Sequence, residues 1–244
     1  MTMPVQHKIW IFAPEHQYVM PYMDRQLSPH YELHYEIDNI DQLYMAVMIS
    51  SVEIYDVTSG KSYNELTSID PESPWNQLER RFTSICNKRG VTPVILRCAP
   101  IVGTGMNGPV MDLVKSLNRG LARHISPAPE TLISLVHAVD LPKVIWELTY
   151  VLPKNVKSPI IYNVTDGVDT DVDDLIEALA HRLNDKRIST VKRRWARLLM
   201  GSAIYRYLTT TLTFSNSQLM EAIQYTPTIV TDYLLTHIYD HDSL

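Results

Sequence analysis

Short apolar runs typical of β-strands alternate along this chain with stretches that have helical periodicity. Residues 75–88 carry apolar side chains at helical spacing and end before Arg89 and Gly90, a pair that suits a helix C-cap. Strands that alternate with helices predict an α/β fold with a parallel sheet. The strand-like runs are KIWIFA (8–13), ELHYEI (32–37), YMAVMI (44–49), VTPVILR (91–97) and IIYNV (160–164).

The remaining segments are predicted to be one fully buried strand, two loops and several helices. The run at 91–97 is apolar at successive positions, which indicates a strand buried on both faces. A polar loop is expected after Asp56, and a glycine-containing loop over 98–109. Helices are predicted over 20–27, 110–120, the second half of 132–152, within 166–183, over 192–208 as one helix, and near 233–239.

Composition excludes several classes of protein. The 244 residues are 45% hydrophobic, enough for a sizeable core, and the net charge of −5 gives no reason to expect nucleic acid as a partner. No stretch approaches the ~18 apolar residues of a membrane span, and the N-terminal run IWIFA is too short for a signal peptide. Two cysteines favour a reducing cytoplasm, although the residues leave a Cys86–Cys98 disulfide open.

Six segments together resemble one known family. In SSVEIYD, Ser51 precedes Tyr55 by four residues. The other segments are SPWNQLE (73–79), VILRCAPIVGTG (94–105), LVHAVDLPKVI (135–145), IIYNVTDG (160–167) and FSNSQLMEAIQYTP (214–227). In this order and spacing they resemble the extended short-chain dehydrogenase/reductases, also called NAD-dependent epimerase/dehydratases.

The resemblance implies a truncated Rossmann-like parallel sheet flanked by helices, with a smaller C-terminal lobe. The shortened core would span 1–100, joined by about 132–164, and the substrate-lobe-like region would span 101–244. Active members use NAD(P) and a tyrosine general acid/base. A lysine four residues later lowers that tyrosine's pKa and holds the cofactor ribose, and a serine binds the reacting oxygen.

The proposed catalytic positions depart from this pattern. Aligning Pro74 puts Trp75 at the tyrosine position and Glu79 at the lysine position. Indole can only donate a hydrogen bond, and a carboxylate raises the pKa of a neighbouring phenol. Ser51 would then stand without a base, so we predict a structural role for it.

The cofactor positions depart as well. After the first strand the chain reads APEHQYVM (13–20), which has no glycine and places Glu15 where a phosphate would lie. Only 34 residues separate Ala13 from Met48, where the family fits several more strands and helices. Asp38 matches a ribose-binding acid of the family but suits a solvated turn. We therefore expect no cofactor, although the family implies NAD(P).

Other polar residues match the family's substrate side. The pocket candidates are Arg97, Pro100, Gly103, His137 and Asn163. For His137 we favour packing, for Asp140 capping of the following helix, and for Asn163 hydrogen bonds to backbone. No metal site is predicted, because neither His30 with His34 nor the C-terminal histidines form a convergent set.

The sequence leaves three functions open. The favoured one is a catalytically degenerate epimerase/dehydratase-like protein that binds a sugar-like or nucleotide ligand or assembles with a partner. The second is an active NAD(P)-dependent nucleotide-sugar epimerase, dehydratase or reductase with a non-standard base, for which Tyr55, Tyr63 or His137 would serve. The third is a structural or interaction protein, in which a homo-oligomer or protein partner covers an exposed sheet edge. Whether the chain is an enzyme stays undecided at this level.

Overall fold

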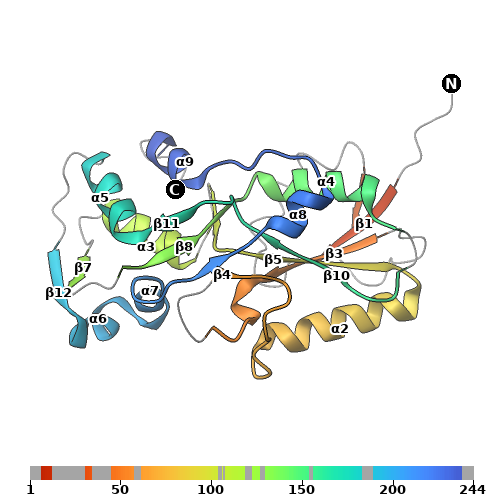
Figure 1. The fold of residues 1–244 in the computed structure, drawn as a ribbon, viewed down its shortest axis with the longest axis horizontal. Helices are drawn as coiled ribbons and strands as arrows, with labels where there is room; N and C mark the ends of the chain where they lie inside the picture. The colour runs from red at the N-terminus through yellow and green to blue at the C-terminus, as the bar shows by residue number, and fades with distance from the viewer. Residues whose placement is uncertain are drawn as a thin grey trace.

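The computed structural model describes residues 7–12, 31–34, 45–57, 62–103, 106, 108–118, 123–126, 130–153, 156–182 and 189–237. Its main sheet has five strands in the order β10-β5-β3-β1-β2 (Figure 1). All the pairings in that sheet are parallel, so the predicted α/β fold with a parallel sheet is confirmed. The strands are β1 (His7–Phe12), β2 (Tyr31–His34), β3 (Met45–Ser51), β5 (Thr92–Cys98) and β10 (Ile160–Val164).

Helices cover both faces of this sheet. Figure 1 shows α2 (Pro74–Arg89) on one side, and α4 (Asp140–Val151) with α8 (Ser217–Ala222) on the other. Every residue of β3 and β5 is buried, as the continuous apolar run at 91–97 predicts. Helix α2 starts at a proline and ends at Gly90, whose φ of 70° lets its N–H reach the carbonyls of Cys86 and Asn87.

The rest of the described chain is built from short strand pairs and helices. Two-stranded ladders join β4 (Ser62–Tyr63) to β13 (Thr213–Phe214), β6 (Ile101–Val102) to β9 (Val136–His137), β7 (Arg123–Ser126) to β12 (Ser189–Lys192), and β8 (Leu132–Ser134) to β11 (Asp169–Asp171). The helical elements are η3 (Val52–Ile54), α3 (Pro109–Asn118), α5 (Val172–Arg182), α6 (Arg193–Met200), α7 (Ser202–Tyr207) and α9 (Val230–His237).

Two local predictions were wrong. The single helix expected over 192–208 is two helices, because Gly201 has a φ of 81° and separates α6 from α7. Asp140 is not the cap of α4, since Val139 occupies that position. Asp140 instead accepts hydrogen bonds from the backbone and hydroxyl of Thr228, so it fastens the C-terminal segment to α4. The helix predicted at 20–27, the segment 13–20 and Asp38 lie outside the described residues.

Two predictions made from composition concern the two cysteines and membrane-spanning segments. Cys86 and Cys98 are both buried and both free thiols. Within the described parts of the chain, every helix is too short or too polar to cross a lipid bilayer.

Candidate functional site

A row of polar residues crosses three neighbouring strands near their carboxyl ends. Ser50 on β3 is in register with Arg97 on β5, and Arg97 is in register with Asn163 on β10. Residues paired in this way project from the same face of a sheet. All three side chains are buried, so each needs a hydrogen-bond partner inside the protein.

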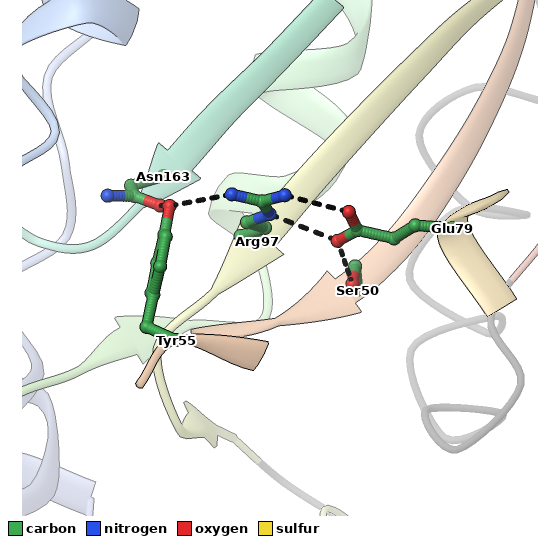
Figure 2. A network of polar contacts seen from close by, with 5 residues as sticks. All are labelled: Ser50, Tyr55, Glu79, Arg97 and Asn163. Carbon is green, nitrogen blue, oxygen red and sulfur yellow. Dashed lines mark hydrogen bonds and ion pairs between the residues drawn. The ribbon is translucent and has the colours of Figure 1, made fainter. Parts of the chain in front are cut away.

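Glu79 of α2 supplies the counter-charge to this row. Its Oε1 accepts from Arg97 Nε at 3.0 Å and its Oε2 accepts from Arg97 Nη2 at 2.8 Å, which makes a bidentate ion pair (Figure 2). Ser50 Oγ donates to Oε1 at 2.7 Å. Burial alone would lower the pKa of Arg97, but the hydrogen bonds and charge of Glu79 outweigh it, and the pKa lies above its ordinary value.

Tyr55 extends the network to β10. Its hydroxyl donates to Asn163 Oδ1 at 2.7 Å and accepts from Arg97 Nη1 at 3.1 Å. The Arg97 guanidinium also lies over the Tyr55 ring, 5.0 Å from its centroid. Burial raises the pKa of Tyr55 above its ordinary value, despite the opposing effect of Arg97. Tyr55 is therefore a poor proton acceptor near neutral pH.

Asn163 connects this network to two other segments. Its backbone N–H donates to Glu65 Oε1 at 2.8 Å, and its side-chain Nδ2 donates to the carbonyl of Ser215 at 3.2 Å. Asn163 therefore makes hydrogen bonds that involve backbone groups, as expected, and also accepts one from the Tyr55 hydroxyl. The network as a whole links β3, α2, β5, β10 and the segment around Ser215. A buried polar network with its members paired in this way rigidifies a core.

An open groove of about 800 Å³ lies along the outer side of this network. Ile95 and Ile161 line its floor beside Arg97, and the exposed side of α2 forms a wall. Polar residues of α2 that line the groove are Asn76, Arg80, Thr83, Ser84, Asn87 and Lys88. The groove therefore combines an apolar floor with amide, hydroxyl and cationic groups.

The residues predicted from the family occupy several separate places. Ser51 caps η3 by accepting from the N–H of Glu53 at 3.1 Å, and Trp75 lies in the hydrophobic core. The carbonyl of Pro100 accepts from the N–H of Val136, and that of Gly103 accepts from Met106. Of the residues predicted for the site, the structure brings together Glu79, Arg97 and Asn163.

His137 has a different environment. Its Nδ1 accepts from the N–H of Val139 at 3.3 Å, and its ring packs against Tyr233 of α9 with centroids 3.9 Å apart. This places His137 where the C-terminal helix joins α4. Nearby, Asp166 accepts from the N–H groups of Val168 and Val230, which fastens the start of α9 to the end of β10.

Sequence reasoning missed Ser50 as a member of the site and treated Tyr55 only as an alternative base. The available signal was a polar residue close to the end of each buried strand. Ser50, Arg97 and Asn163 each follow an apolar run, and the carboxyl ends of parallel strands meet at one edge of the sheet. Strand pairing, which the sequence does not give, is what places them in one row.

The side chains that the resemblance places at the catalytic positions do not suit the catalytic use of a nicotinamide cofactor. Glu79, which the resemblance aligns with the family's ribose-binding lysine, has its carboxylate held by Arg97 and Ser50. Trp75, which the resemblance aligns with the family's general acid/base, is a buried indole. The segment 13–20, expected to face a pyrophosphate, lies outside the described residues. Among the residues that are described, no cluster of metal-ligating side chains occurs.

Comparison with known proteins shows similarity in fold and not in sequence. No protein-family model matches the sequence. No curated protein matches it either. Solved structures do match. The human epimerase family protein SDR39U1 with NADPH is similar at a TM-score of 0.69 and 9% identity, over 96% of this chain and 99% of that one.

Two bacterial structures are similar to the same degree. RMD from Pseudomonas aeruginosa, complexed with NADPH, has a TM-score of 0.68 at 13% identity and covers 96% of this chain and 98% of its own. UDP-glucose 4-epimerase from Bifidobacterium longum, in complex with NAD+ and UDP, has a TM-score of 0.67 at 11% identity and covers 95% and 96%. Likeness at these identities establishes the fold, so this chain has the Rossmann-like fold of the NAD-dependent epimerase/dehydratases that its sequence resembles.

Proposed function

We propose that this chain is a catalytically degenerate relative of the NAD-dependent epimerase/dehydratases that acts as a ligand-binding or assembly protein. One observation carries the proposal. Glu79, which the resemblance aligns with the family's lysine, is held in a buried, bidentate ion pair with Arg97. A carboxylate held in this way neither binds a ribose as an ammonium would nor lowers the pKa of a catalytic phenol.

Two further features support the loss of proton transfer. Trp75 at the tyrosine position is buried among apolar side chains and has no proton to exchange near neutral pH. Tyr55, the phenol of the buried polar network, has a raised pKa, and its hydroxyl donates a hydrogen bond to Asn163. These contacts weigh against an active enzyme that uses Tyr55 as its base. The buried free thiols agree with the proposed cytoplasmic location.

Calorimetry and a turnover assay test this proposal together. Titration with NAD+, NADH, NADP+ and NADPH is expected to give no tight binding, and UDP-glucose should be recovered unchanged, with no epimerised, dehydrated or reduced product. The double variant Trp75→Tyr/Glu79→Lys restores the family's side chains. It is expected to remain inactive and to be destabilised, because the introduced ammonium would face Arg97 in the core. Turnover by the unaltered chain, or tight nicotinamide binding, would refute the proposal.

For the ligand we propose a phosphorylated, sugar-like or nucleotide compound bound in the groove beside α2. The exposed cations Arg80 and Lys88 can meet phosphate, Asn76 and Thr83 can bind hydroxyl groups, and the apolar floor can pack against a ring. The likeness to a structure that holds UDP motivates the choice of probe.

Isothermal titration with UDP and UDP-glucose tests the groove separately from the loss of catalysis. Binding is expected to be weakened at least about tenfold in Arg80→Gln/Lys88→Gln, since two charge-assisted contacts are removed. Arg81→Gln is the matched control, because Arg81 is exposed on the same helix but does not line the groove. Equal affinity in all three proteins would exclude the groove as the binding site, and no binding at all would exclude this ligand class. Neither result would affect the proposal on catalysis.

A further inference from the structure

Helix α6 and the residue before it carry an exposed surface that the proposed function does not use. We call this the α6 surface. Its apolar members are Trp195, Leu198 and Leu199, and its basic members are Lys192, Arg193, Arg194 and Arg197. The exposed fractions of the three apolar side chains are 52%, 78% and 55%. Large apolar side chains exposed together on one short helix usually mark an interaction site.

Helical geometry gives α6 a buried side, an exposed apolar face and a basic side. Ala196 is fully buried and fixes the side that packs on the protein. Trp195, Leu198 and Leu199 are at positions i, i+3 and i+4, so they share one face, and that face is exposed. Arg193 and Arg197 are four residues apart and lie beside each other between these two sides. The apolar face is therefore exposed and is bordered on one side by cations.

The charge of this surface opposes that of the whole chain. Four basic residues fall within 192–197, residues 192–200 contain no acidic residue, and the chain as a whole has a net charge of −5. All four basic residues are exposed. The guanidinium of Arg194 lies 5.8 Å from the centroid of the Trp195 ring, which keeps a cation beside the aromatic side chain. An anionic partner is complementary to this local charge.

The position of α6 leaves it accessible to a large partner. Figure 1 shows α6 with β12 at one end of the long axis of the molecule, away from the five-stranded sheet. Helix α6 contacts α7, β12 and β7 on its inner side. A flat surface could therefore approach the outer side of α6 without meeting the sheet or α2.

We propose that the α6 surface docks this protein on an anionic lipid bilayer. The phosphates of acidic lipids are complementary to the basic side chains, and the interface offers an apolar layer for Trp195, Leu198 and Leu199. Tryptophan is favoured at the level of lipid headgroups. A free nucleotide phosphate would satisfy the cations but would leave the three apolar side chains in water, so a lipid surface fits both halves of the pattern.

Vesicle co-sedimentation of the full chain tests this proposal. Binding is expected to vesicles of phosphatidylcholine mixed with phosphatidylglycerol, to be weak on phosphatidylcholine alone, and to be largely released by about 0.5 M NaCl. Each basic residue contributes about a fivefold increase in partitioning, so Arg193→Gln/Arg194→Gln/Arg197→Gln should lower it about a hundredfold. Leu198→Ser/Leu199→Ser should lower it on the same vesicles at low salt.

Matched controls separate the α6 surface from general charge and hydrophobicity. Arg81→Gln/Arg89→Gln/Lys157→Gln removes three exposed cations elsewhere, and Leu66→Ser removes another exposed leucine. Both should bind vesicles like the unaltered chain. Circular dichroism of each variant shows whether it is folded. If a variant does not fold, the salt dependence of vesicle binding by the unaltered chain still tests the proposal.

Three results would overturn the proposal. The first is binding that is equal on neutral and anionic vesicles. The second is loss of binding in the control variants to the same extent as in the α6 variants. The third is light scattering that shows a dimer which Leu198→Ser/Leu199→Ser dissociates, with no vesicle binding by the unaltered chain, since the apolar residues would then be covered by a second copy.

Discussion

At the scale of single residues, the molecule depends on one buried charge pair. Glu79 and Arg97 are both almost inaccessible to water, and each leaves its partner uncompensated if it is removed. Such a pair adds little to the free energy of unfolding compared with two well-packed apolar side chains. Removing one partner nevertheless lowers that free energy strongly, because the remaining charge stays buried. The identity of residue 79 is therefore coupled to that of residue 97.

The first prediction concerns Glu79→Gln. We expect the free energy of unfolding to fall by about 3–5 kcal/mol, because Arg97 loses its buried counter-charge. Urea denaturation measures this change, and the exposed Glu72→Gln should change it by less than about 0.5 kcal/mol. Glu79→Leu/Arg97→Met should be more stable than Glu79→Gln. A loss below about 1 kcal/mol in Glu79→Gln would show that the pair is dispensable.

A second prediction at this scale follows from Cys86. Burial raises the pKa of its thiol from 9.0 to about 12. The unfolded thiol loses its proton first as pH rises, so the contribution of Cys86 to stability is present below about pH 9 and is lost toward pH 12. Urea denaturation between about pH 8 and 11 should show a steeper decline for the unaltered chain than for Cys86→Ala. Parallel declines would contradict the assignment.

At the scale of elements, the length of a pattern decides what could be predicted from the sequence. Helix α2 and strands β3, β5 and β10 were found because each presents a helical repeat or an unbroken apolar run bounded by turn residues. The paired strands β4 and β13 have two residues each, which is too short for any period to appear. Their pairing is long-range and depends on the fold around them.

The division of α6 from α7 was missed for a related reason. The amphipathic pattern continues through Gly201, and a glycine is tolerated inside a helix at moderate cost, so the sequence alone does not identify the break. The candidate site shows the same limit. Arg97 and Asn163 were selected one by one, but their row with Ser50 depends on strand order and register.

Gly201→Ala provides the prediction at this scale. With φ of 81° and ψ of 160°, Gly201 occupies a region that other residues rarely adopt, and an added Cβ would meet nothing within 4 Å. Backbone strain alone should lower the free energy of unfolding by about 1–3 kcal/mol. Gly90→Asn is the control, because φ of 70° and ψ of 25° suit asparagine, and its loss should be smaller. Equal losses in chemical denaturation would contradict this interpretation.

At the scale of the whole molecule, the two predicted regions are interleaved. The predicted division, with a core of 1–100 joined by about 132–164 and a substrate-lobe-like region over 101–244, has no test in the described residues and stays a proposal. Strand β10, which was predicted to join the core, pairs with β5, and β13 of the substrate-lobe-like region pairs with β4 of the core. Asn163 also binds Glu65 in the first region and Ser215 in the second. Removing either region would leave buried groups of the other without partners.

This interleaving predicts one cooperative unfolding transition. Because β10 completes the sheet whose polar row holds Arg97, loss of residues 101–244 should expose Arg97 and destabilise residues 1–100. Urea unfolding followed by far-ultraviolet circular dichroism and by tryptophan fluorescence should give coincident curves, since the four tryptophans are spread from residue 10 to residue 195. A fragment of residues 1–100 should not fold. Two separated transitions, or a folded fragment, would instead establish two independent domains.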